Sequence, residues 1–467
     1  MIDISTRKNQ TIAVLGFGSS GLMAARALKQ SGARILAWDD NLPQRNRAEQ
    51  AGIATTDLTA QDFSGTDALV LAPGIPFTHR PHTLVEKARA ASVSIIGDIE
   101  LLVEACPQAR FVGITGTNGK STTTALLGHI LERAGVKAQI GGNLGPPALG
   151  LAPPETGEAM VLELSSYQLD LTEHACFDIA LLLNVSPDHL DRHGDMAGYI
   201  AAKKRIFRDR QGASRQIAVI GIDDPHCSAI YNDMSNRPGW TAIPVSALHR
   251  PAGGVYVEDG ILIDDRNGDA MPVRDLNGIV SLTGRHNWQN AAAAYAAACA
   301  LGVAPAVTAA AFESYPGLPH RLELVATIDG VRYINDSKAT NGEAAAQALA
   351  CFDAIYWIAG GRAKEEGLAP TLDSLDGVRA AYLIGESEEV FFEQLQGRVP
   401  ATRCGDLASA LTHATRQAAR DRAQDRTHNA VILLSPAAAS FDQWANFEAR
   451  GDGFRALVLA IQAEATV

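Results

Sequence analysis

A glycine loop between an apolar run and a helix-like stretch constrains the fold of this chain most. The apolar run Phe111–Thr115 leads into the loop, and a Lys-Ser pair closes it. Backbone N–H groups of such a loop, with those of the first turn of the next helix, point at phosphate oxygens. The lysine adds charge for the β- and γ-phosphates, and the hydroxyl can bind Mg²⁺. We therefore predict a nucleoside triphosphate site that comprises Gly116, Thr117, Asn118, Gly119, Lys120, Ser121 and Thr122.

The spacing of this loop leaves one alternative open. Ile114 stands where the pattern G-x-x-x-x-G-K-[ST] has its first glycine. The alternative is an ordinary strand-to-helix turn with an exposed lysine. Few such turns also carry Lys-Ser at the required place, which favours the phosphate loop.

Composition limits the class of protein. The chain has 467 residues, of which 46% are hydrophobic and 20% charged, and this length suggests about three domains. The net charge of −12 provides no broad basic field for nucleic acid. The six cysteines form no C-x-x-C pair, which is typical of a reducing cytosol and predicts no metal cluster. No signal layout or membrane-length apolar run is present, so we expect a cytoplasmic protein without a membrane span.

A second glycine loop lies near the N-terminus. Thr11–Leu15 reads as a buried strand, Gly16–Gly21 has the pattern G-x-G-x-x-G, and Ala33–Asp39 reads as the next strand. The acid Asp39 lies near the distance expected for a ribose hydroxyl. Alone, the motif suggests a dehydrogenase. The same geometry serves any diphosphate-linked ribose, because the helix N-terminus recognises the pyrophosphate and the carboxylate the sugar.

Two later strands end in candidate metal ligands. Ala159–Glu163 ends in an acid, and Ile179–Val185 leads to a string that contains Asp188 and His189. Mg²⁺ ligands are needed beside a phosphate loop, and carboxylates at the ends of neighbouring strands can supply them. Glu163 is therefore a metal candidate. From 216 to 279, weak alternating stretches predict antiparallel strands at one sheet edge.

The last third predicts another open α/β sheet. Strand-like runs at 331–335, 354–359, 380–384 and 430–434 each end in a polar loop, and helical stretches lie between them. Such a sheet places its functional groups along one edge.

Several blocks together resemble the Mur ligases, the amide-forming enzymes of peptidoglycan precursor synthesis. They are the loop 115–121, the string 184–189, the block 284–290 and Asp-Ser-Lys-Ala-Thr-Asn at 336–341. The likeness extends over nearly the full chain and points to the members that add glutamate to UDP-N-acetylmuramoyl-L-alanine. It implies three α/β domains: a Rossmann-like UDP-binding domain at 1–98, a P-loop ATPase-like domain with a mostly parallel sheet at 99–302, and a Rossmann-like amino-acid-binding domain at 303–467.

The resemblance also implies site residues. Catalytic roles fall to Lys120, His189, Lys203 and Lys338, and the Mg²⁺ ligands would be Ser121, Glu163, His189 and a carbamylated Lys203. ATP would further be bound by Asn287, Arg321 and Asp336. The small-molecule substrates would be bound by Ser19, Ser20, Asp39, Asp40, Asn143, Thr340, Lys364, Ser440 and Phe447.

The implied reaction is ATP-dependent amide formation through an acyl phosphate, which yields ADP and phosphate. D-glutamate is the family's usual amino acid, although some relatives take L-glutamate. A folylpolyglutamate synthase shares the ATP domain but would lack the N-terminal glycine loop with Asp39. A non-catalytic nucleotide switch stays an alternative from another class.

Overall fold

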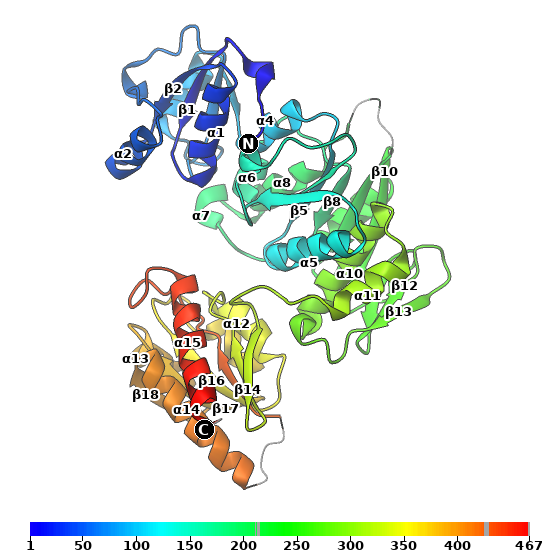
Figure 1. The fold of residues 1–467 in the computed structure, drawn as a ribbon, viewed down its shortest axis with the longest axis vertical. Helices are drawn as coiled ribbons and strands as arrows, with labels where there is room; N and C mark the ends of the chain where they lie inside the picture. Colours follow the sequence, from blue (N-terminus) through cyan, green and yellow to red (C-terminus); the bar gives the residue numbers. More distant parts are fainter. Residues whose placement is uncertain (211, 213–214, 425–428, 466–467) are drawn as a thin grey trace. The chain divides into compact units, whose positions relative to one another are not determined.

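The computed structural model describes residues 1–210, 212, 215–424 and 429–465. The chain forms two compact units (Figure 1). Unit 1 comprises Met1–Asp275 and Gln289–Glu313, and unit 2 comprises Leu276–Trp288 and Ser314–Val467. Two sheets lie in unit 1 and one in unit 2.

The first sheet is parallel and has the strand order β2-β1-β3-β4. Its strands are β1 (Thr11–Leu15), β2 (Arg34–Trp38), β3 (Ala68–Leu71) and β4 (Ser94–Ile96), and its helices are α1 (Ser19–Gln30), α2 (Leu42–Gln50), α3 (Thr83–Ala90) and α4 (Asp98–Ala105). The turn between β1 and α1 requires glycine. A Cβ at Gly21 would lie 2.0 Å from the carbonyl oxygen of Gly16, so helix and strand approach each other closely here.

The second sheet has nine strands in the order β13-β12-β11-β10-β9-β8-β5-β7-β6. Neighbours from β6 to β11 pair in parallel, and β11, β12 and β13 form an antiparallel edge. The strands are β5 (Arg110–Thr115), β6 (Ala138–Gly142), β7 (Ala159–Glu163), β8 (Ile179–Leu182), β9 (Gln216–Gly221), β10 (Trp240–Ser246), β11 (Val255–Glu258), β12 (Ile261–Asp264) and β13 (Met271–Asp275).

Helices lie between the parallel strands of this sheet along the chain: α5 (Lys120–Arg133), α6 (Ser166–Asp170), α7 (Leu190–His193), α8 (Met196–Lys204) and α9 (Pro225–Ser235). Helices α10 (Arg285–Ala300) and α11 (Pro305–Glu313) follow β13. Strand β5 lies between β7 and β8, and β8 lies next to β9. The ends of these neighbouring strands therefore gather the loops at 116–119, 164–165 and 183–189 along one edge.

The third sheet has the order β14-β15-β19-β16-β17-β18, with β14 antiparallel to an otherwise parallel set. Its strands are β14 (Glu323–Ile328), β15 (Val331–Asn335), β16 (Ile355–Gly360), β17 (Val378–Ile384), β18 (Ala401–Gly405) and β19 (Val431–Leu434). Its helices are α12 (Gly342–Leu349), α13 (Glu388–Leu395), α14 (Leu407–Ala423) and α15 (Phe447–Ala465).

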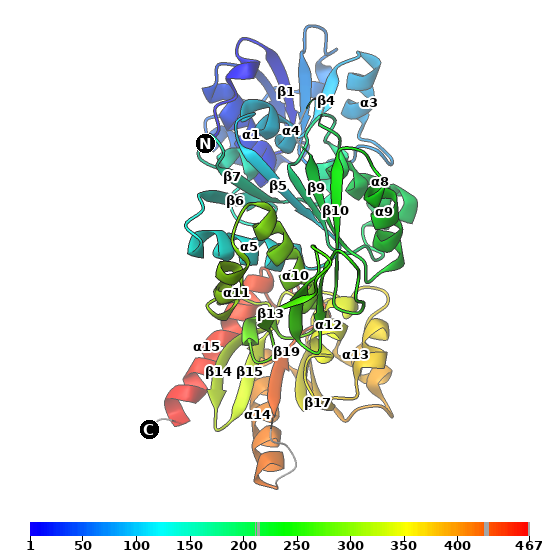
Figure 2. The same cartoon turned by 90° about the vertical axis from the view of Figure 1, so that its right-hand side faces the viewer.

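Alternate residues of β16 enter different cores of this third sheet. Trp357 packs in the cluster with Leu349 of α12 and Leu395 of α13, while Tyr356 packs in the cluster with Leu411 of α14 and Phe454 of α15. Helices therefore cover both faces of the sheet (Figure 2).

The structure confirms the predicted mixed α/β class with mostly parallel sheets. The domain limits at 98 and 302 stay predictions. Within the described residues, no helix has the length and apolar content needed to cross a membrane. All six cysteines are described and none forms a disulfide.

Two local predictions were wrong. The stretch from 216 to 246 forms β9 and β10, which pair in parallel, because α9 provides the crossover that a parallel connection requires. Only the later part of that region is antiparallel among the described residues. The glycine-rich stretch Gly141–Gly145 reads from sequence as a turn, but Gly141 and Gly142 belong to β6 and pair with β7. Glycine is required at Gly142 because a Cβ there would lie 2.4 Å from the carbonyl oxygen of Glu163 on the paired strand.

Candidate active site

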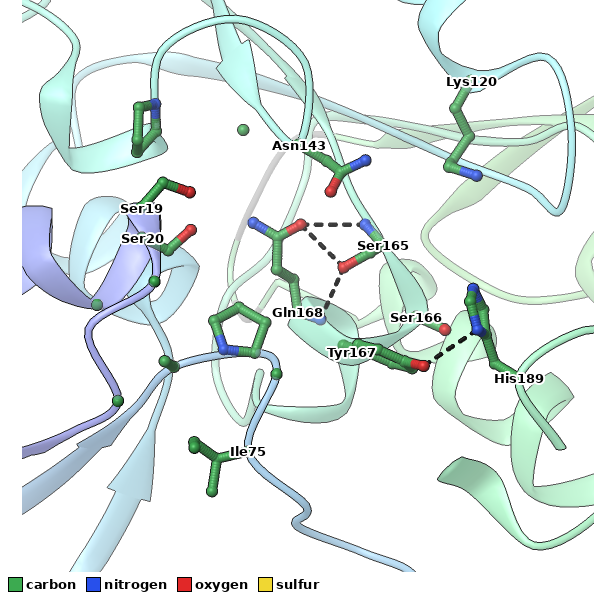
Figure 3. Close-up of a pocket in the computed structure, with 18 of the residues that line it drawn as sticks. Ser19, Ser20, Ile75, Lys120, Asn143, Ser165, Ser166, Tyr167, Gln168 and His189 are labelled. Atoms are coloured by element: carbon green, nitrogen blue, oxygen red, sulfur yellow. Dashed lines mark hydrogen bonds between the residues drawn. The ribbon is translucent and has the colours of Figure 1, made fainter. Parts of the chain in front are cut away.

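A cavity of about 550 Å³ lies in unit 1 between loops of the first and second sheets. It is lined by Gly16, Gly18, Ser19, Ser20, Gly21, Asp39, Ala72, Pro73, Gly74, Ile75, Lys120, Gly142, Asn143, Gly145, Pro147, Ser165, Ser166, Tyr167, Gln168, Asp188, His189, Tyr199 and Lys203. In Figure 3, Ser19 and Ser20 lie across the cavity from Lys120 and His189. The cavity thus brings together residues of both predicted glycine loops.

The N-terminal wall is the start of α1 with the glycine loop before it. Ser19 and Ser20 open α1 and line the cavity. The carboxylate of Asp39 accepts hydrogen bonds from the backbone N–H groups of Phe17, at 2.6 Å, and Asn41, at 2.8 Å. Asp39 therefore stabilises the N-terminal glycine loop and also lines the cavity.

Asp40, to which the resemblance assigned substrate binding, makes its contacts outside the lining of this cavity, and its role stays a prediction. Its carboxylate contacts the His82 ring at 2.8 Å and accepts a hydrogen bond from the Trp38 ring N–H at 3.0 Å. The hydrogen bond with His82 is the largest cause of the lowered pKa of Asp40. The structure does not place Asp40 among the residues that line the cavity.

The predicted phosphate loop is held by Asn184 and packs closely against Asn290. The side-chain oxygen of Asn184 accepts from the backbone N–H of Asn118 at 2.8 Å, and its backbone oxygen accepts from Thr117 at 2.9 Å. Gly119 has φ +82°, and a Cβ there would lie 2.2 Å from the side-chain oxygen of Asn290. Only glycine fits that conformation and that contact without strain.

Two lysines approach this loop. The Nζ of Lys120 donates to the carbonyl oxygens of Gly116 and Thr117, both at 2.9 Å. The Nζ of Lys203 donates to the Gly116 carbonyl at 2.8 Å and lies 4.6 Å from the centre of the Tyr199 ring. Lys203 is 1% exposed, and burial, followed by the charge of Lys120, lowers its pKa well below the usual value. Both effects favour the neutral amine over the ammonium form.

His189 lies at the edge of the cavity in a strained backbone conformation, with φ +52°. Its Nδ1 and the hydroxyl of Tyr167 are 3.0 Å apart, and Figure 3 shows this contact. Its Nε2 lies 3.4 Å from a carboxylate oxygen of Asp188. Burial lowers the pKa of His189, and Asp188 opposes that shift. A neutral imidazole is the form that binds a metal.

Glu163 ends β7 beside the phosphate loop. One carboxylate oxygen accepts a hydrogen bond from the Asn143 amide at 2.8 Å, and the other is buried without a partner. A buried carboxylate oxygen without a partner suits a cation, because its desolvation is otherwise uncompensated. No cluster of three or more His, Cys, Asp or Glu side chains suited to a metal occurs in the described part of the chain. A fit to Mg²⁺ therefore also requires Ser121, phosphates and water.

The predicted nucleotide contacts of the last third lie in unit 2. Asp336 is buried; its carboxylate accepts from the Ser435 hydroxyl at 2.8 Å and from the Leu322 backbone at 3.2 Å. Burial raises its pKa to about 7, and the hydrogen bond from Ser435 is the largest opposing effect. Arg321 also opposes the rise through its charge. Asn287 donates to the Thr283 carbonyl at 2.9 Å, a helix-start contact.

The residues predicted to bind the substrate glutamate lie on the loops after β15, β16 and β19. The Nζ of Lys338 lies 3.8 Å from the centre of the Phe447 ring. Thr340 is half-buried, Lys364 is exposed after Gly360-Gly361, and Ser440 is buried. Because β15, β19 and β16 are neighbours and parallel, their loops gather at one edge.

Arg450 of α15 joins these three loops. Its guanidinium donates to the Ser337 hydroxyl and carbonyl at 3.0 and 2.9 Å, to the Ala438 carbonyl at 3.1 Å twice, and to the Gly360 carbonyl at 3.3 Å. Burial lowers its pKa to about 10. One side chain thus fixes the backbone around the predicted amino-acid pocket.

Comparison with known proteins decides the family. A model described as the Mur ligase middle domain matches residues 114–298, and one described as the Mur ligase glutamate ligase domain matches 320–438. The chain is 47% identical over 465 residues to the UDP-N-acetylmuramoylalanine–D-glutamate ligase of Caulobacter sp. (strain K31), with 98% of each chain covered. It is 48% identical over 462 residues to the ligase of that name from Paramagnetospirillum magneticum, again with 98% of each covered. The chain belongs to the Mur ligase family.

A solved structure supports the fold of this Mur ligase. A pseudomurein peptide ligase type C from Methanothermus fervidus superposes with a TM-score of 0.56 at 18% identity and covers 97% of this chain and 100% of its own. The middle-domain match includes the phosphate loop, Glu163, His189 and Lys203. The glutamate-ligase match includes Asp336, Lys338, Thr340 and Lys364 and ends before Ser440 and Phe447.

Sequence reasoning missed several residues of this Mur ligase's site. Ser165 and Gln168 line the cavity and form a capping box, and the pattern Ser-x-x-Gln at the end of β7 could have revealed it. The Tyr199 hydroxyl lies 3.2 Å from that of Thr117, but an aromatic residue in a helix gives no such signal. No sequence pattern distinguishes Arg450 from other helical arginines, because its partners are not its neighbours in sequence. Ser337 and Gly360 lie more than 70 residues before it, and the third partner is Ala438.

Proposed function

We propose that this Mur ligase joins D-glutamate to UDP-N-acetylmuramoyl-L-alanine, with ATP as the energy source and Mg²⁺ as the required ion. One observation carries the proposal: two predicted phosphate-binding groups line the same cavity. They are Lys120, the lysine of the predicted triphosphate loop, and Ser19 and Ser20 at the start of α1, a helix N-terminus that can bind a diphosphate. An enzyme that activates a UDP-sugar carboxylate with ATP needs these two phosphate sites side by side. The names of the two relatives support the choice of substrates.

The proposed chemistry has two steps. An oxygen of the alanine carboxylate attacks the γ-phosphorus of ATP, the bond between that phosphorus and the β,γ-bridging oxygen breaks, and ADP leaves. The amino group of glutamate then attacks the acyl carbon, loses a proton, and displaces inorganic phosphate. The protein contributes positioning and charge stabilisation in both steps.

Residues of unit 1 account for the first step. Lys120 would leave its loop carbonyls to meet the β- and γ-phosphates, and Ser19 and Ser20 would hold the UDP diphosphate at the start of α1. Asp39 keeps the glycine loop in shape through its bonds to Phe17 and Asn41. Together they would hold the alanine carboxylate close to the γ-phosphate.

Mg²⁺ would neutralise charge that develops on the transferred phosphoryl group. Glu163 and Ser121 are its proposed ligands at the phosphate loop, with His189 and Lys203 at a second position. The buried amine of Lys203 supports carbamylation, because a neutral amine can attack CO₂ and the adduct carries a metal-binding carboxylate. These assignments agree with the unpartnered oxygen of Glu163.

Unit 2 would supply the amino-acid pocket. Lys364 would bind the side-chain carboxylate of glutamate, while Thr340 and Ser440 would donate to its α-carboxylate. Lys338 lies against Phe447, and Arg450 fixes the loops on which these groups lie. Asn287, Arg321 and Asp336 are proposed contacts of ATP. The predicted location in the cytoplasm stays a prediction.

A phosphate-release assay and a cofactor-binding measurement separate four alternatives. A phosphate-release assay is run with the complete mixture and with each substrate omitted in turn. We expect ATP turnover only with both UDP-N-acetylmuramoyl-L-alanine and D-glutamate, and ADP as the nucleotide product. Preference for L-glutamate would change the assigned amino acid, and turnover with a folate acceptor would indicate a folylpolyglutamate synthase. Turnover independent of both substrates would indicate a nucleotide switch, and binding of NAD in place of the UDP-sugar would indicate a dehydrogenase.

A further inference from the structure

Arg192, on α7 three residues after His189, is a buried cation whose role the proposed chemistry leaves unassigned. The side chain is 8% exposed, and its Nη2 donates to the Pro73 carbonyl at 3.3 Å. Within the described residues, its Nε and Nη1 are buried without a hydrogen-bond partner. Burial lowers its pKa, and Asp170 opposes the shift. Burial of a guanidinium is unfavourable unless its contacts compensate for the lost hydration, so the contacts that Arg192 makes must account for its position.

One contact of Arg192 reaches the acceptor side of the cavity. Pro73, Gly74 and Ile75 follow β3 and line the cavity. A Cβ at Gly16 would lie 3.0 Å from the Ile75 side chain, so this loop also packs on the first glycine loop. Arg192 therefore links α7, which follows a strand of the second sheet, to the Pro73–Ile75 loop beside the proposed UDP-sugar site.

The other contact reaches the metal side. The guanidinium carbon of Arg192 lies 5.0 Å from the centre of the Tyr167 ring, within range of a cation–π interaction. The hydroxyl of Tyr167 lies 3.0 Å from Nδ1 of His189, and their rings are 5.0 Å apart. The contacts thus run from the Pro73 carbonyl through Arg192 and Tyr167 to His189.

We propose that Arg192 and Tyr167 are positioning residues of the ligation: Arg192 sets the Pro73–Ile75 loop for the UDP-sugar acceptor, and Tyr167 orients His189 for its metal. The inference rests on the proposed function. If Tyr167 accepts a hydrogen bond from the Nδ1–H of His189, the lone pair of Nε2 is left for the metal. The ring of Tyr167 at the same time supports the guanidinium of Arg192.

The two roles predict different consequences for two variants. Arg192→Met loses the bond to Pro73 and the cation–π contact, whereas Tyr167→Phe keeps the ring and loses only the hydroxyl. We expect Arg192→Met to weaken acceptor binding about tenfold, the equivalent of about 1.4 kcal/mol. We expect Tyr167→Phe to weaken metal binding about tenfold, in the range found for residues that orient a metal ligand. Acceptor binding to Tyr167→Phe should stay within about twofold of wild type, less than about 0.5 kcal/mol.

Binding is measured on the full chain, without turnover. Calorimetric titration with UDP-N-acetylmuramoyl-L-alanine gives the acceptor Kd, and titration with Mn²⁺ in the presence of a non-hydrolysable ATP analogue, with free Mn²⁺ read by paramagnetic resonance, gives the metal Kd. Arg237→Met is the matched control, because Arg237 forms an exposed pair with Asp209 at 2.6 Å far from these loops in sequence. Melting temperatures are recorded for every variant.

The outcomes separate this inference from the proposed function. If wild type does not bind the acceptor, the proposed function fails. If wild type binds it and Arg192→Met binds it equally well, the role of Arg192 is refuted; an unchanged Mn²⁺ Kd in Tyr167→Phe refutes the role of Tyr167. Equal weakening of acceptor and ATP analogue by Arg192→Met would mean general damage and would also refute it. Arg192→Lys, which keeps the charge but not the flat stacking, covers the case in which Arg192→Met does not fold, and it should weaken acceptor binding in the same direction.

Discussion

Replacement of Arg450 by methionine should destabilise unit 2 more than any exposed arginine replacement. The guanidinium donates to three backbone carbonyls and one hydroxyl, all from loops after β15, β16 and β19. Methionine has similar length but no donor, so these acceptors lose their partner while they stay buried. A buried acceptor without a partner costs about 1–3 kcal/mol, so three carbonyls suggest about 3–9 kcal/mol.

Part of that loss is offset, because methionine removes a buried charge. We expect the free energy of unfolding to fall by about 3 kcal/mol. Arg455→Met is the control on the same helix: Arg455 binds Glu323 at 2.8 Å but is partly exposed, and such pairs contribute about 0–1 kcal/mol.

The assay is urea unfolding of the full chain, followed by tryptophan fluorescence and calorimetry so that separate transitions of the two units are resolved. Trp357, fully buried in the third sheet, reports on unit 2. A loss below about 1 kcal/mol for Arg450→Met, or a loss equal to that of Arg455→Met, would refute the reasoning that these hydrogen bonds fix the loops.

Three further predictions concern single residues. Lys203→Ala should lower kcat at least about 100-fold if the side chain supplies a metal ligand; steady-state kinetics with and without bicarbonate test this, and near-normal activity would contradict it. Lys364→Ala should raise the KM for glutamate about tenfold and leave the KM for ATP unchanged, since in the proposed pocket the charge would contact only the amino acid; equal changes in both constants would count against this role. Asp336→Asn should gain stability over wild type as pH rises from about 4 to about 7, because burial raises the pKa of Asp336 to about 7 and the native carboxyl then keeps a proton that the unfolded chain has released. Calorimetry across this range measures the difference in stability between Asp336→Asn and wild type, which should stop increasing above pH 7.

The sequence predicted the parallel cores well, because their strands are short apolar runs that end in glycine or polar loops. Strands β1, β5, β15 and β19 lie within one residue of their predicted limits. Edge strands were harder: β6 contains two glycines, and none of the five residues of β18 is buried. An edge strand has one neighbour and little apolar burial, so its pattern is weak.

The candidate site was predictable where a residue type has one chemistry at a fixed spacing, as in the loop that ends at Lys120. The series of contacts from Tyr167 through Arg192 to Pro73 was not predictable. It joins residues from α6, α7 and the loop after β3, and only the folded chain brings them within contact. The same holds for Asp40, which matched a position by sequence but pairs with His82 in the structure.

The central claim, amide formation through an acyl phosphate, is tested most directly by following oxygen. UDP-N-acetylmuramoyl-L-alanine labelled with ¹⁸O in its alanine carboxylate is incubated with the enzyme, ATP, Mg²⁺ and D-glutamate, and the products are analysed by mass spectrometry. The proposed chemistry predicts one ¹⁸O atom in each inorganic phosphate, with ADP as the nucleotide product and one ¹⁸O atom left in the new amide. Label in AMP, or unlabelled phosphate alongside the amide product, would contradict it.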